Sequence, residues 1–496
     1  GHAPWTSLLQ GMHGFGYWAG IFLMDPNSNM IQPLQPDLRT TDFARWSNVP
    51  VERIRLGLHR LAYAGRFDDS GIAILYSRAS QHATTAWRGR HFRNPLARSL
   101  WPETEAVTIG SLLHQVGYQY SRISDEQIRD GLLQRSGVKL LVLPVSQAVS
   151  PEAAEAIRRF VTAGGTVLAD VRPAVVTRHG VRHGARGALD DVFGIEQDTA
   201  WSAFDLAPRA LKVKLGNHDA TTAPAAVTGS DLKTAGARAL VQSDVPVMLV
   251  NRVGRGHAVL LNTLVSRLGG ASRPVLDDVL ARAGIDPLFK VTRLDGGDGG
   301  PAADDPDDGM FGNAEGFMDA LAGAATRPVL YRHVLGGADL VGLSSNRQRH
   351  GAGTTTLEVT WPRPGHVYDV VDNTYLGRHA TGTISKPAEG VAVFVVVPHR
   401  IEKPTVALRQ RPDRLGRPVL VVDITATTDG SWQRALQVKL VAPKDTVEPI
   451  VDTVLCTDGA ARFDAVLPMD APRGTWTVTV TDAVSAEAVT TRFTLE

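Results

Sequence analysis

The sequence predicts a multidomain protein that combines an α/β domain with all-β modules. Between about residues 65 and 290, short apolar runs alternate with amphipathic helical patterns, which is typical of a parallel sheet covered by helices. Beyond about residue 325, short alternating segments are separated by Asp, Gly and Pro, which indicates antiparallel β modules. The length of 496 residues allows about three to four domains.

A strand–helix–strand unit carries the α/β prediction. Val138–Pro144 is a nearly continuous apolar run, as a strand buried on both faces requires. Ser150 and Pro151 supply the N-cap and first position of a helix that stops at Gly164-Gly165, before a second strand at Thr166–Asp170. This spacing predicts a crossover in a parallel sheet. Further strands are expected at Gly71–Tyr76, Val247–Val250 and His257–Asn262, and further helices at Thr104–Val116 and Val275–Ala283.

The first 64 residues and the last 170 differ from this middle region. The N-terminal part predicts a helix end at Leu8–Gln10, a strand at Gly14–Trp18, a loop at Asp25–Asp37 and a helix at Val51–Ala64, which together cannot bury a core. Asp295–Gly309 is rich in Gly, Pro and Asp and indicates a linker. The β-rich remainder predicts strands at Thr355–Val359, Val367–Val371, Val391–Val397, Val419–Thr425, Leu436–Val441, Ala461–Val466 and Thr475–Thr481.

Composition excludes several function classes. Lys plus Arg number 52 and Asp plus Glu 51, so the charge balance gives no support for nucleic acid or an anionic membrane as partner. Cys456 is the single cysteine, which rules out an intramolecular disulfide and a cysteine-based zinc site. The longest apolar runs suit buried strands rather than a membrane span. The chain starts without Met, so we expect its first residue to be a processing or cloning boundary.

Three motifs follow one another along the α/β region: VKLLVLPVSQAVSPEAAEAIRRFVTAGGTVLAD (Val138–Asp170), GALDDVFGIE (Gly187–Glu196) and PVMLVNRVGRGHAVLLNT (Pro246–Thr263). Together they resemble the trimerisation domain of the family-42 β-galactosidases. The resemblance implies a flavodoxin-like, glutamine-amidotransferase-like α/β domain that trimerises, with a (β/α)8 barrel before it and a small β domain after it.

On this resemblance the chain divides into five parts. Residues 1–64 would be the last βα unit of a (β/α)8 barrel, 65–290 the trimerisation domain, 291–324 a linker and 325–402 a small β domain. Residues 403–496 resemble an immunoglobulin-like β-sandwich, which gives two C-terminal β-sandwich modules in all.

The resemblance also indicates where glycosidase chemistry would lie. Retaining enzymes of this kind use two glutamates on barrel strands four and seven, about 5 Å apart. Because the barrel begins here at strand eight, both are expected upstream of the chain, which alone should not hydrolyse glycosides. Trp18 would end strand eight, where an indole face can stack on a sugar; Tyr17 and His13 are weaker substrate-binding candidates, and all three also suit core or loop roles.

Other chemistries have weaker support. A glutaminase needs a cysteine on a strand-to-helix elbow, and Thr166–Asp170 runs instead into Val171-Arg172-Pro173. Ser146 lacks the glycine-flanked elbow of serine hydrolases. His179 and His183 suit a loop better than a metal site. Asp295–Asp308 suits a linker better than a calcium site. Glu103 and Glu105 suit the start of a helix better than a catalytic pair. We therefore predict no metal, cofactor or catalytic residue in this chain.

Two functions remain open. The first is a non-catalytic C-terminal portion of a β-galactosidase-like enzyme, which forms homo-oligomers, contacts the barrel and helps to shape the active site. The second is a non-enzymatic protein that binds carbohydrate or a cell surface through a degenerate amidotransferase-like domain. The appended β module favours export to the periplasm or the exterior.

Overall fold

The computed structural model describes most of the chain, and its contacts group it into two units. The described residues are 3–12, 39, 42–90, 101–199, 208–209, 212–215, 218–221, 226–227, 232–242, 246–268, 271–294, 328–344, 354–387, 390–445 and 447–496. The α/β unit contains Asp69–Leu288, and the β unit combines Gly1–Asp68, Phe289–Gly296 and Pro328–Glu496. The five-part division of the sequence stays a prediction.

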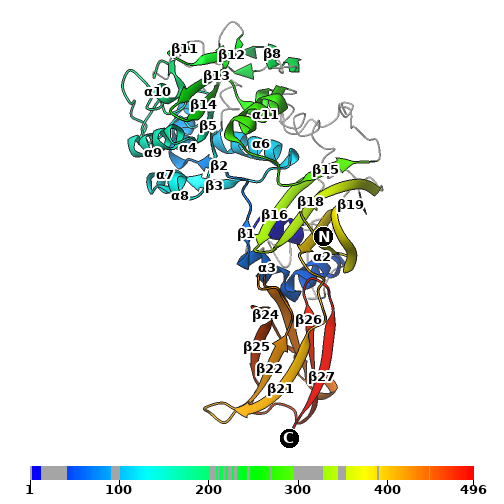
Figure 1. Ribbon diagram of the computed structural model, residues 1–496. Helices are drawn as coiled ribbons and strands as arrows, with labels where there is room; N and C mark the ends of the chain where they lie inside the picture. Colours follow the sequence, from blue (N-terminus) through cyan, green and yellow to red (C-terminus); the bar gives the residue numbers. More distant parts are fainter. Residues whose placement is uncertain are drawn as a thin grey trace. The chain divides into compact units, whose positions relative to one another are not determined.

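A mixed sheet forms the centre of the α/β unit (Figure 1). Its strand order is β12-β13-β14-β5-β4-β2-β3, and the run from β14 to β3 is parallel. Among the parallel strands, this is the doubly wound order 2-1-3-4-5. The strands are β2 (Ile72–Tyr76), β3 (Ser121–Ser124), β4 (Leu140–Leu143), β5 (Thr166–Ala169), β12 (Arg238–Gln242), β13 (Pro246–Val253) and β14 (Gly256–Leu261).

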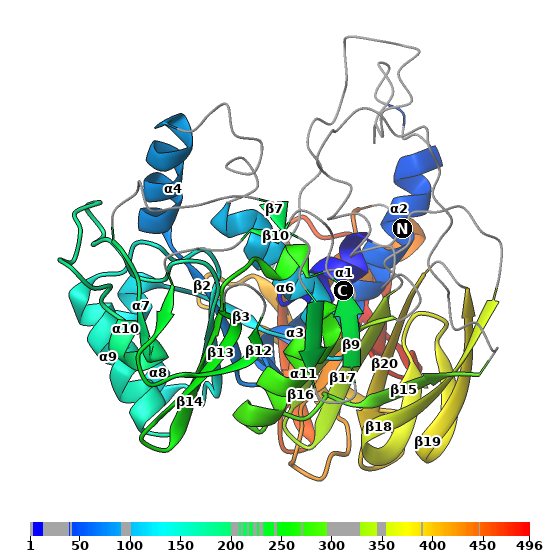
Figure 2. The ribbon, with the colours of Figure 1, turned by 90° about the horizontal axis from the view of Figure 1, so that it is seen from above.

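Helices cover both faces of this sheet (Figure 2). Alternate residues of each strand enter opposite cores: Ile72 and Ile74 of β2 pack with α6 and α11, whereas Ala73 and Leu75 pack with α7, α8, α9 and α10. Burial of each large aliphatic side chain contributes about 1.5–3 kcal/mol. The helices are α4 (Arg78–Arg90), α6 (Pro102–Gln115), α7 (Asp125–Arg129), α8 (Leu132–Arg135), α9 (Pro151–Thr162), α10 (Asp190–Phe193) and α11 (Ser272–Ala283).

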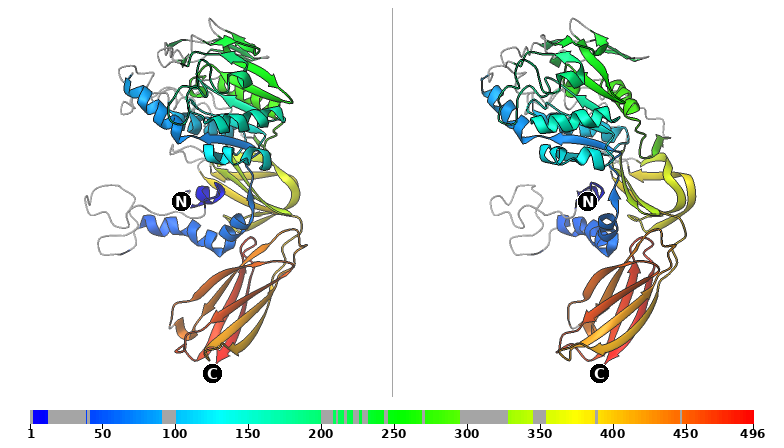
Figure 3. Two further views of the ribbon diagram at one scale, coloured as in Figure 1. Left: turned by 90° about the vertical axis from the view of Figure 1, so that its left-hand side faces the viewer. Right: turned by 60° about the vertical axis from the view of Figure 1, so that its left-hand side comes forward.

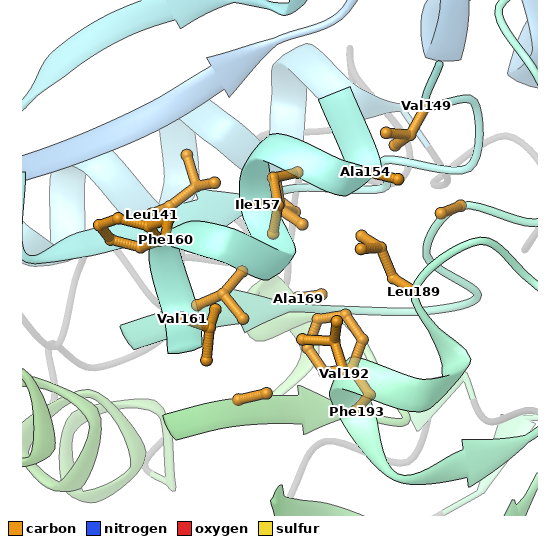
Figure 4. Packing of buried hydrophobic residues seen from close by; sticks show 14 of the residues in the cluster. Leu141, Val149, Ala154, Ile157, Phe160, Val161, Ala169, Leu189, Val192 and Phe193 are labelled. Carbon is orange, nitrogen blue, oxygen red and sulfur yellow. The ribbon is translucent and has the colours of Figure 1, made fainter. Parts of the chain in front are cut away.

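Helix α9 forms where its caps predict it. The Ser150 side chain accepts a hydrogen bond from the Ala153 amide, and the helix ends before Gly164, whose φ of 117° suits only glycine. Ile157 and Phe160 on its inner face pack with residues of β4, β5 and α10 (Figure 4). This packing fixes the loop before the helix as well as the helix itself.

Short strands and one 3₁₀ turn complete the described part of the α/β unit. Three antiparallel pairs lie between α10 and β12, and the turn follows β14. The pairs are β6 (Ile195–Glu196) with β11 (Lys233–Thr234), β7 (Pro208–Arg209) with β10 (Ala226–Val227), and β8 (Lys212–Leu215) with β9 (His218–Thr221); the turn, η3, is Val265–Arg267.

A second sheet forms the centre of the β unit. Its order is β1-β16-β17-β20-β18-β15, with β19 paired to β18 outside this path. The strands are β1 (Arg66–Phe67), β15 (Lys290–Arg293), β16 (Val329–Leu335), β17 (Ala338–Ser344), β18 (Thr354–Asp369), β19 (Thr374–Pro387) and β20 (Val391–Val397).

Strand β18 corrects one sequence prediction. Thr355–Val359 and Val367–Val371 were expected as separate strands, but β18 is continuous from Thr354 to Asp369. The segment that contains Pro362 and Pro364 lies in a register shift between Thr360 and Gly365, where a proline removes no ladder hydrogen bond. The turn predicted at Asp372-Asn373 is present, and Asn373 has a φ of 54°.

Helical segments from the N-terminal part belong to the β unit, and those that contain Leu8, Leu58 and Leu61 share a core with this sheet. The segments are α1 (Ala3–Leu9), α2 (Asp42–Arg53), the π-helical turn η1 (Ile54–Leu58) and α3 (His59–Ala64), so the helix expected from Val51 begins earlier and contains a π-turn. Gly57, with a φ of 143°, provides the break in helical geometry. A Cβ at Gly57 would lie 2.7 Å from Ala435 Cβ, so glycine permits this close contact.

Two antiparallel sheets form the C-terminal module (Figure 3). One core of buried residues, including Leu420, Leu436 and Trp476, draws on both sheets. The strands of the first sheet are β21 (Thr405–Pro412), β22 (Pro418–Thr425) and β25 (Ala460–Val466); those of the second are β24 (Ile450–Cys456), β23 (Arg434–Val441), β26 (Gly474–Asp482) and β27 (Ala488–Leu495), and a 3₁₀ turn, η5, covers Pro443–Asp445. Over the described residues of both units, no helix is long and apolar enough to cross a bilayer.

Candidate functional site

The three residues predicted to bind substrate lie outside the described part of the chain. His13, Tyr17 and Trp18 fall between α1 and α2, as do the strand expected at Gly14–Trp18 and the loop at Asp25–Asp37. Their role at a barrel end therefore stays a prediction. Asp295–Asp308, the calcium candidate, lies outside the described residues too.

The carboxyl edge of the parallel sheet is the place where a doubly wound domain would bind a ligand. Here β2 ends before Ser77, β4 before Pro144, β5 before Asp170 and β14 before Asn262. Ser77, Asp170 and Asn262 are buried polar residues, with exposures of 4%, 2% and 3%. This edge is therefore polar and shielded from solvent.

The loop after β4 turns sharply at this edge. Val145 has a φ of 41°, which is unfavourable for a β-branched residue. Its amide donates to Asp170 Oδ1 at 2.6 Å, and the next peptides are held by Ala174, whose amide donates to the Ser146 carbonyl at 2.9 Å. Ser80 Oγ accepts from the Ala148 amide at 3.1 Å. Contacts to the loop after β5 and to α4 thus maintain the strained turn.

Asp170 and Glu105 form a buried carboxyl pair that the sequence did not reveal. Burial, and then the charge of Glu105, raise the pKa of Asp170 well above its ordinary value. Burial also raises the pKa of Glu105, although Ser266, whose amide donates to Glu105 Oε1 at 3.1 Å, acts in the opposite direction. Asp170 Oδ2 is buried without a hydrogen-bond partner among the described residues. The pair therefore favours a protonated carboxyl.

The side chains at this edge do not supply a nucleophile for acyl transfer. Ser146 Oγ donates to the Pro144 carbonyl at 3.2 Å, and Ser80 Oγ donates to the Ala148 carbonyl at 3.1 Å, so both hydroxyls hold the loop. Cys456 lies in the β unit, where it is buried and burial raises the pKa of its thiol. Among the described residues at this edge, none forms the activated pair that a glutaminase or serine hydrolase requires.

The acidic motif Gly187–Glu196 also has a structural role. Asp190 accepts hydrogen bonds from the Gly187 amide at 2.9 Å and from Gln197 Nε2 at 2.7 Å, and burial raises its pKa to about 6. Asp191 forms a two-point contact with Arg158, at 2.8 and 2.9 Å. These bonds join α10 to α9 and to the loop after β5.

The remaining charged candidates are separate from one another. Glu103 pairs with Arg122 at 2.8 and 3.1 Å rather than with Glu105. His183 contacts the Val149 carbonyl at 3.0 Å, and His179 Nε2 accepts from Arg178, both outside any helix. No group of three or more His, Cys, Asp or Glu among the described residues is placed to hold a metal ion.

Comparison with known proteins places this geometry in a family context. Residues 71–286 match the sequence model of a family described as the β-galactosidase trimerisation domain. The recognition made from the three motifs is thereby confirmed, and the chain is similar to the C-terminal part of family-42 β-galactosidases. A comparison with curated protein sequences gave no match.

Solved structures support the same fold. A β-galactosidase from Bacillus circulans sp. alkalophilus matches with a TM-score of 0.53 and 16% identity over 74% of this chain and 47% of its own. A family-42 β-galactosidase from G. stearothermophilus, solved as a catalytic mutant, matches with a TM-score of 0.53 and 16% identity over 78% and 49%. A cold-adapted β-galactosidase from a Rahnella species has a TM-score of 0.54 and 15% identity over 79% and 50%. The chain spans about half the length of these structures.

Proposed function

We propose that this chain is the non-catalytic C-terminal portion of a β-galactosidase-like glycoside hydrolase, and that its α/β unit associates with copies of itself. The closed carboxyl edge of the sheet carries the proposal. Its hydroxyls and carboxyls bond to the loops around them, so the unit keeps the fold of an amidotransferase-like domain without its chemistry. The match of residues 71–286 to a trimerisation domain supports association as its role.

Within this proposal, residues 1–64 form the end of a (β/α)8 barrel and Trp18 contributes a sugar-stacking face. The C-terminal β modules, one of them an immunoglobulin-like sandwich, extend the assembly. The buried Glu105–Asp170 pair does not meet the needs of a retaining glycosidase, because both side chains are sealed from a sugar. Such an enzyme needs its two carboxyls open to the substrate.

A small patch on the α/β unit is suited to contact a second copy. Arg122 lies over the Tyr76 ring at 5.7 Å and is held by the Glu103 carboxylate. Val107 follows Glu103 by one turn of α6 and therefore lies on the same face of the helix. Tyr76 and Val107 are 37% and 41% exposed, so both apolar side chains are accessible to a second copy. An aromatic–aliphatic centre beside a charged pair is typical of a protein interface.

Sedimentation velocity of the purified chain tests the association. We expect a concentration-dependent oligomer that Val107→Asp weakens at least tenfold. Val181→Asp is the matched control, because Val181 is an exposed valine in a loop of the same unit, and it should leave the oligomer unchanged. A chain that stays monomeric at all concentrations would exclude the self-association.

An activity assay tests the non-catalytic part separately. The purified chain should release no chromophore from nitrophenyl galactosides above the rate of a heat-denatured sample. Turnover that scales with chain concentration and co-purifies with it would overturn this part of the proposal without affecting the mass measurement.

A further inference from the structure

The long hairpin of β18 and β19 borders a half-open pocket of about 300 Å³ in the β unit. Its lining includes Trp361 and Asp372 from the β18 side and Gly382, Thr383 and Lys386 from β19. The volume lies at the lower end of the range for small-molecule sites, about 300–1,000 Å³. The pocket therefore suits a small ligand. In Figure 2 the two strands lie side by side at one end of their sheet.

Trp361 gives the pocket an aromatic wall with an unused donor. The side chain is 5% exposed and packs edge-on against Phe394, with ring centroids 5.1 Å apart. Its indole Nε1 has no hydrogen-bond partner among the described residues. A Cβ added at Gly382 would lie 3.4 Å from Nε1, so the glycine leaves room beside the indole N–H. A buried donor of this kind is costly unless it finds an acceptor.

Lys386 and two aspartates give the pocket fixed charges. Lys386 Nζ donates to Asp369 Oδ2 at 2.5 Å and to Asp372 Oδ2 at 2.8 Å. Burial lowers the pKa of Lys386, but the two carboxylates outweigh it and raise the pKa overall. Asp369 is also fixed by the amides of Val371 and Asp372, at 3.0 and 3.1 Å. Two carboxylates against one ammonium leave the pocket with a net negative charge, which disfavours anions.

Polar residues contribute to the rest of the lining. Thr374, Thr383 and Ser385 are among the lining residues, and the Asp372 side chain is 63% exposed. His379 is held by its Nε2 contact to the Leu376 carbonyl at 2.7 Å, which fixes the ring as part of the wall. A ligand that fits this lining must offer several hydroxyls and an apolar face, and carry no negative charge.

We propose that the β18–β19 pocket binds a single neutral sugar ring, with the Trp361 indole as its aromatic wall and the Asp372 carboxylate as an acceptor for sugar hydroxyls. This function goes beyond self-association and does not depend on it, because every lining residue belongs to the β unit. Loss of sugar binding would leave the oligomer intact, so the two proposals fail separately.

Fluorine NMR of the full chain labelled with 5-fluorotryptophan tests the site, and Trp361→Phe identifies the Trp361 resonance. Titration with D-galactose or D-glucose should shift that resonance saturably, with a dissociation constant on the order of 1–10 mM. D-galacturonate, which adds a negative charge, should bind at least tenfold more weakly. Absence of a saturable shift with both neutral sugars would overturn the proposal, and equal binding of galacturonate would overturn its charge selectivity.

Substitutions locate the binding. Gly382→Val fills the space beside the indole and should weaken sugar binding at least tenfold. Thr381→Val is the matched control, because Thr381 is the neighbouring residue on β19 and does not line the pocket. If Gly382→Val fails to fold, Asp372→Asn removes one acceptor charge at an exposed position and should weaken binding several-fold. Wild-type affinity in a folded Gly382→Val or Asp372→Asn chain would place the sugar elsewhere.

Discussion

Polar side chains lie beside strands both at the carboxyl edge of the α/β sheet and in the β18–β19 hairpin. They are buried at the sheet edge, whereas in the hairpin they border a pocket. At the sheet edge, Asp170 accepts from the Val145 amide, the Ser146 hydroxyl donates to the Pro144 carbonyl, and both side chains are buried. In the hairpin, Asp372 and Lys386 border a pocket of about 300 Å³. The family match covers the first region and not the second. Likeness to a family therefore identifies a fold here without locating the surface that is open to a ligand.

The largest expected effect tests whether the α/β unit and the β unit unfold independently of each other. Arg434 and Asp482 form an ion pair in the β unit with both side chains 1% exposed. Arg434→Met leaves Asp482 charged and buried, so we expect a loss of about 3–5 kcal/mol in the free energy of unfolding. Calorimetry should show this loss in the transition of the β unit alone. Arg411→Met, which breaks an exposed pair, should cost about 1 kcal/mol or less. An equal shift of the α/β transition would contradict the separation.

The next prediction concerns acid sensitivity of the α/β unit. Burial lowers the pKa of His114 to about 4 from an ordinary value of 6.5. The unfolded chain therefore takes up a proton below pH 6.5 that the folded chain takes up only near pH 4, and stability falls as the pH drops through this window. Between pH 7 and pH 4.5 we expect a loss of about 2–3 kcal/mol from this residue.

His114→Phe isolates that contribution. The replacement keeps an aromatic ring against Tyr120, whose centroid lies 5.0 Å from that of His114, and removes the titration. Urea unfolding of both proteins at the two pH values should show a smaller acid loss in the variant. The same acid loss in both proteins would show that His114 does not titrate as its burial predicts.

Asp170 should have the opposite pH dependence. Its raised pKa means that the folded chain holds a proton more tightly than the unfolded chain, so its contribution to stability is greatest at low pH and declines as the pH rises above about 4. Asp170→Asn keeps an acceptor for the Val145 amide and does not titrate. Relative to wild type, the variant should gain stability as the pH rises from 4.5 to 7.

Asp191→Asn provides the control for this measurement. The hydrogen bond from Arg158 lowers the pKa of Asp191, so both the folded and unfolded states are ionised across the same pH window. The difference between this variant and wild type should not change with pH. A pH-independent difference for Asp170→Asn as well would contradict the buried carboxyl pair.

The smallest effect concerns a cap that the sequence predicted. Ser150→Ala removes the acceptor for the Ala153 amide at the start of α9 and should cost about 1 kcal/mol. Ser136→Ala, at an exposed serine of the same unit, should change the free energy of unfolding by less than about 0.5 kcal/mol. Equal effects of the two substitutions in urea unfolding would show that the cap adds no stability.

The α/β elements were predictable because their signals are local. Ser150 and Pro151 begin α9, and the apolar runs of β4 and β5 match strands buried on both faces. The strands that escaped prediction have weaker patterns: β21 is largely exposed and carries two arginines, so it lacks a clear apolar face. Strand β18 was predicted as two segments, whereas a register shift keeps it continuous through Pro362 and Pro364.

The candidate sites were less predictable than the fold. Glu105 and Asp170 are 65 positions apart in the chain, and only tertiary packing gives each a raised pKa. The hairpin pocket depends on Trp361 and Gly382 meeting across a shifted register, which no sequence spacing encodes. The carboxyl pair and the hairpin pocket both contain a buried polar atom, and that burial arises only when distant segments of the chain come together.

The strand order of the β-unit sheet has a practical consequence for protein engineering. The α/β unit is inserted between β1 and β15, which occupy opposite ends of the path β1-β16-β17-β20-β18-β15. At about 4.8 Å per strand, the five steps of this path span roughly 24 Å across the sheet, and the registers add an offset along the strands, because Lys290 pairs with Thr360 of β18. A gene that omits Asp69–Leu288 would therefore need a replacement linker that spans both distances. A direct fusion of Asp68 to Phe289 would detach an edge strand.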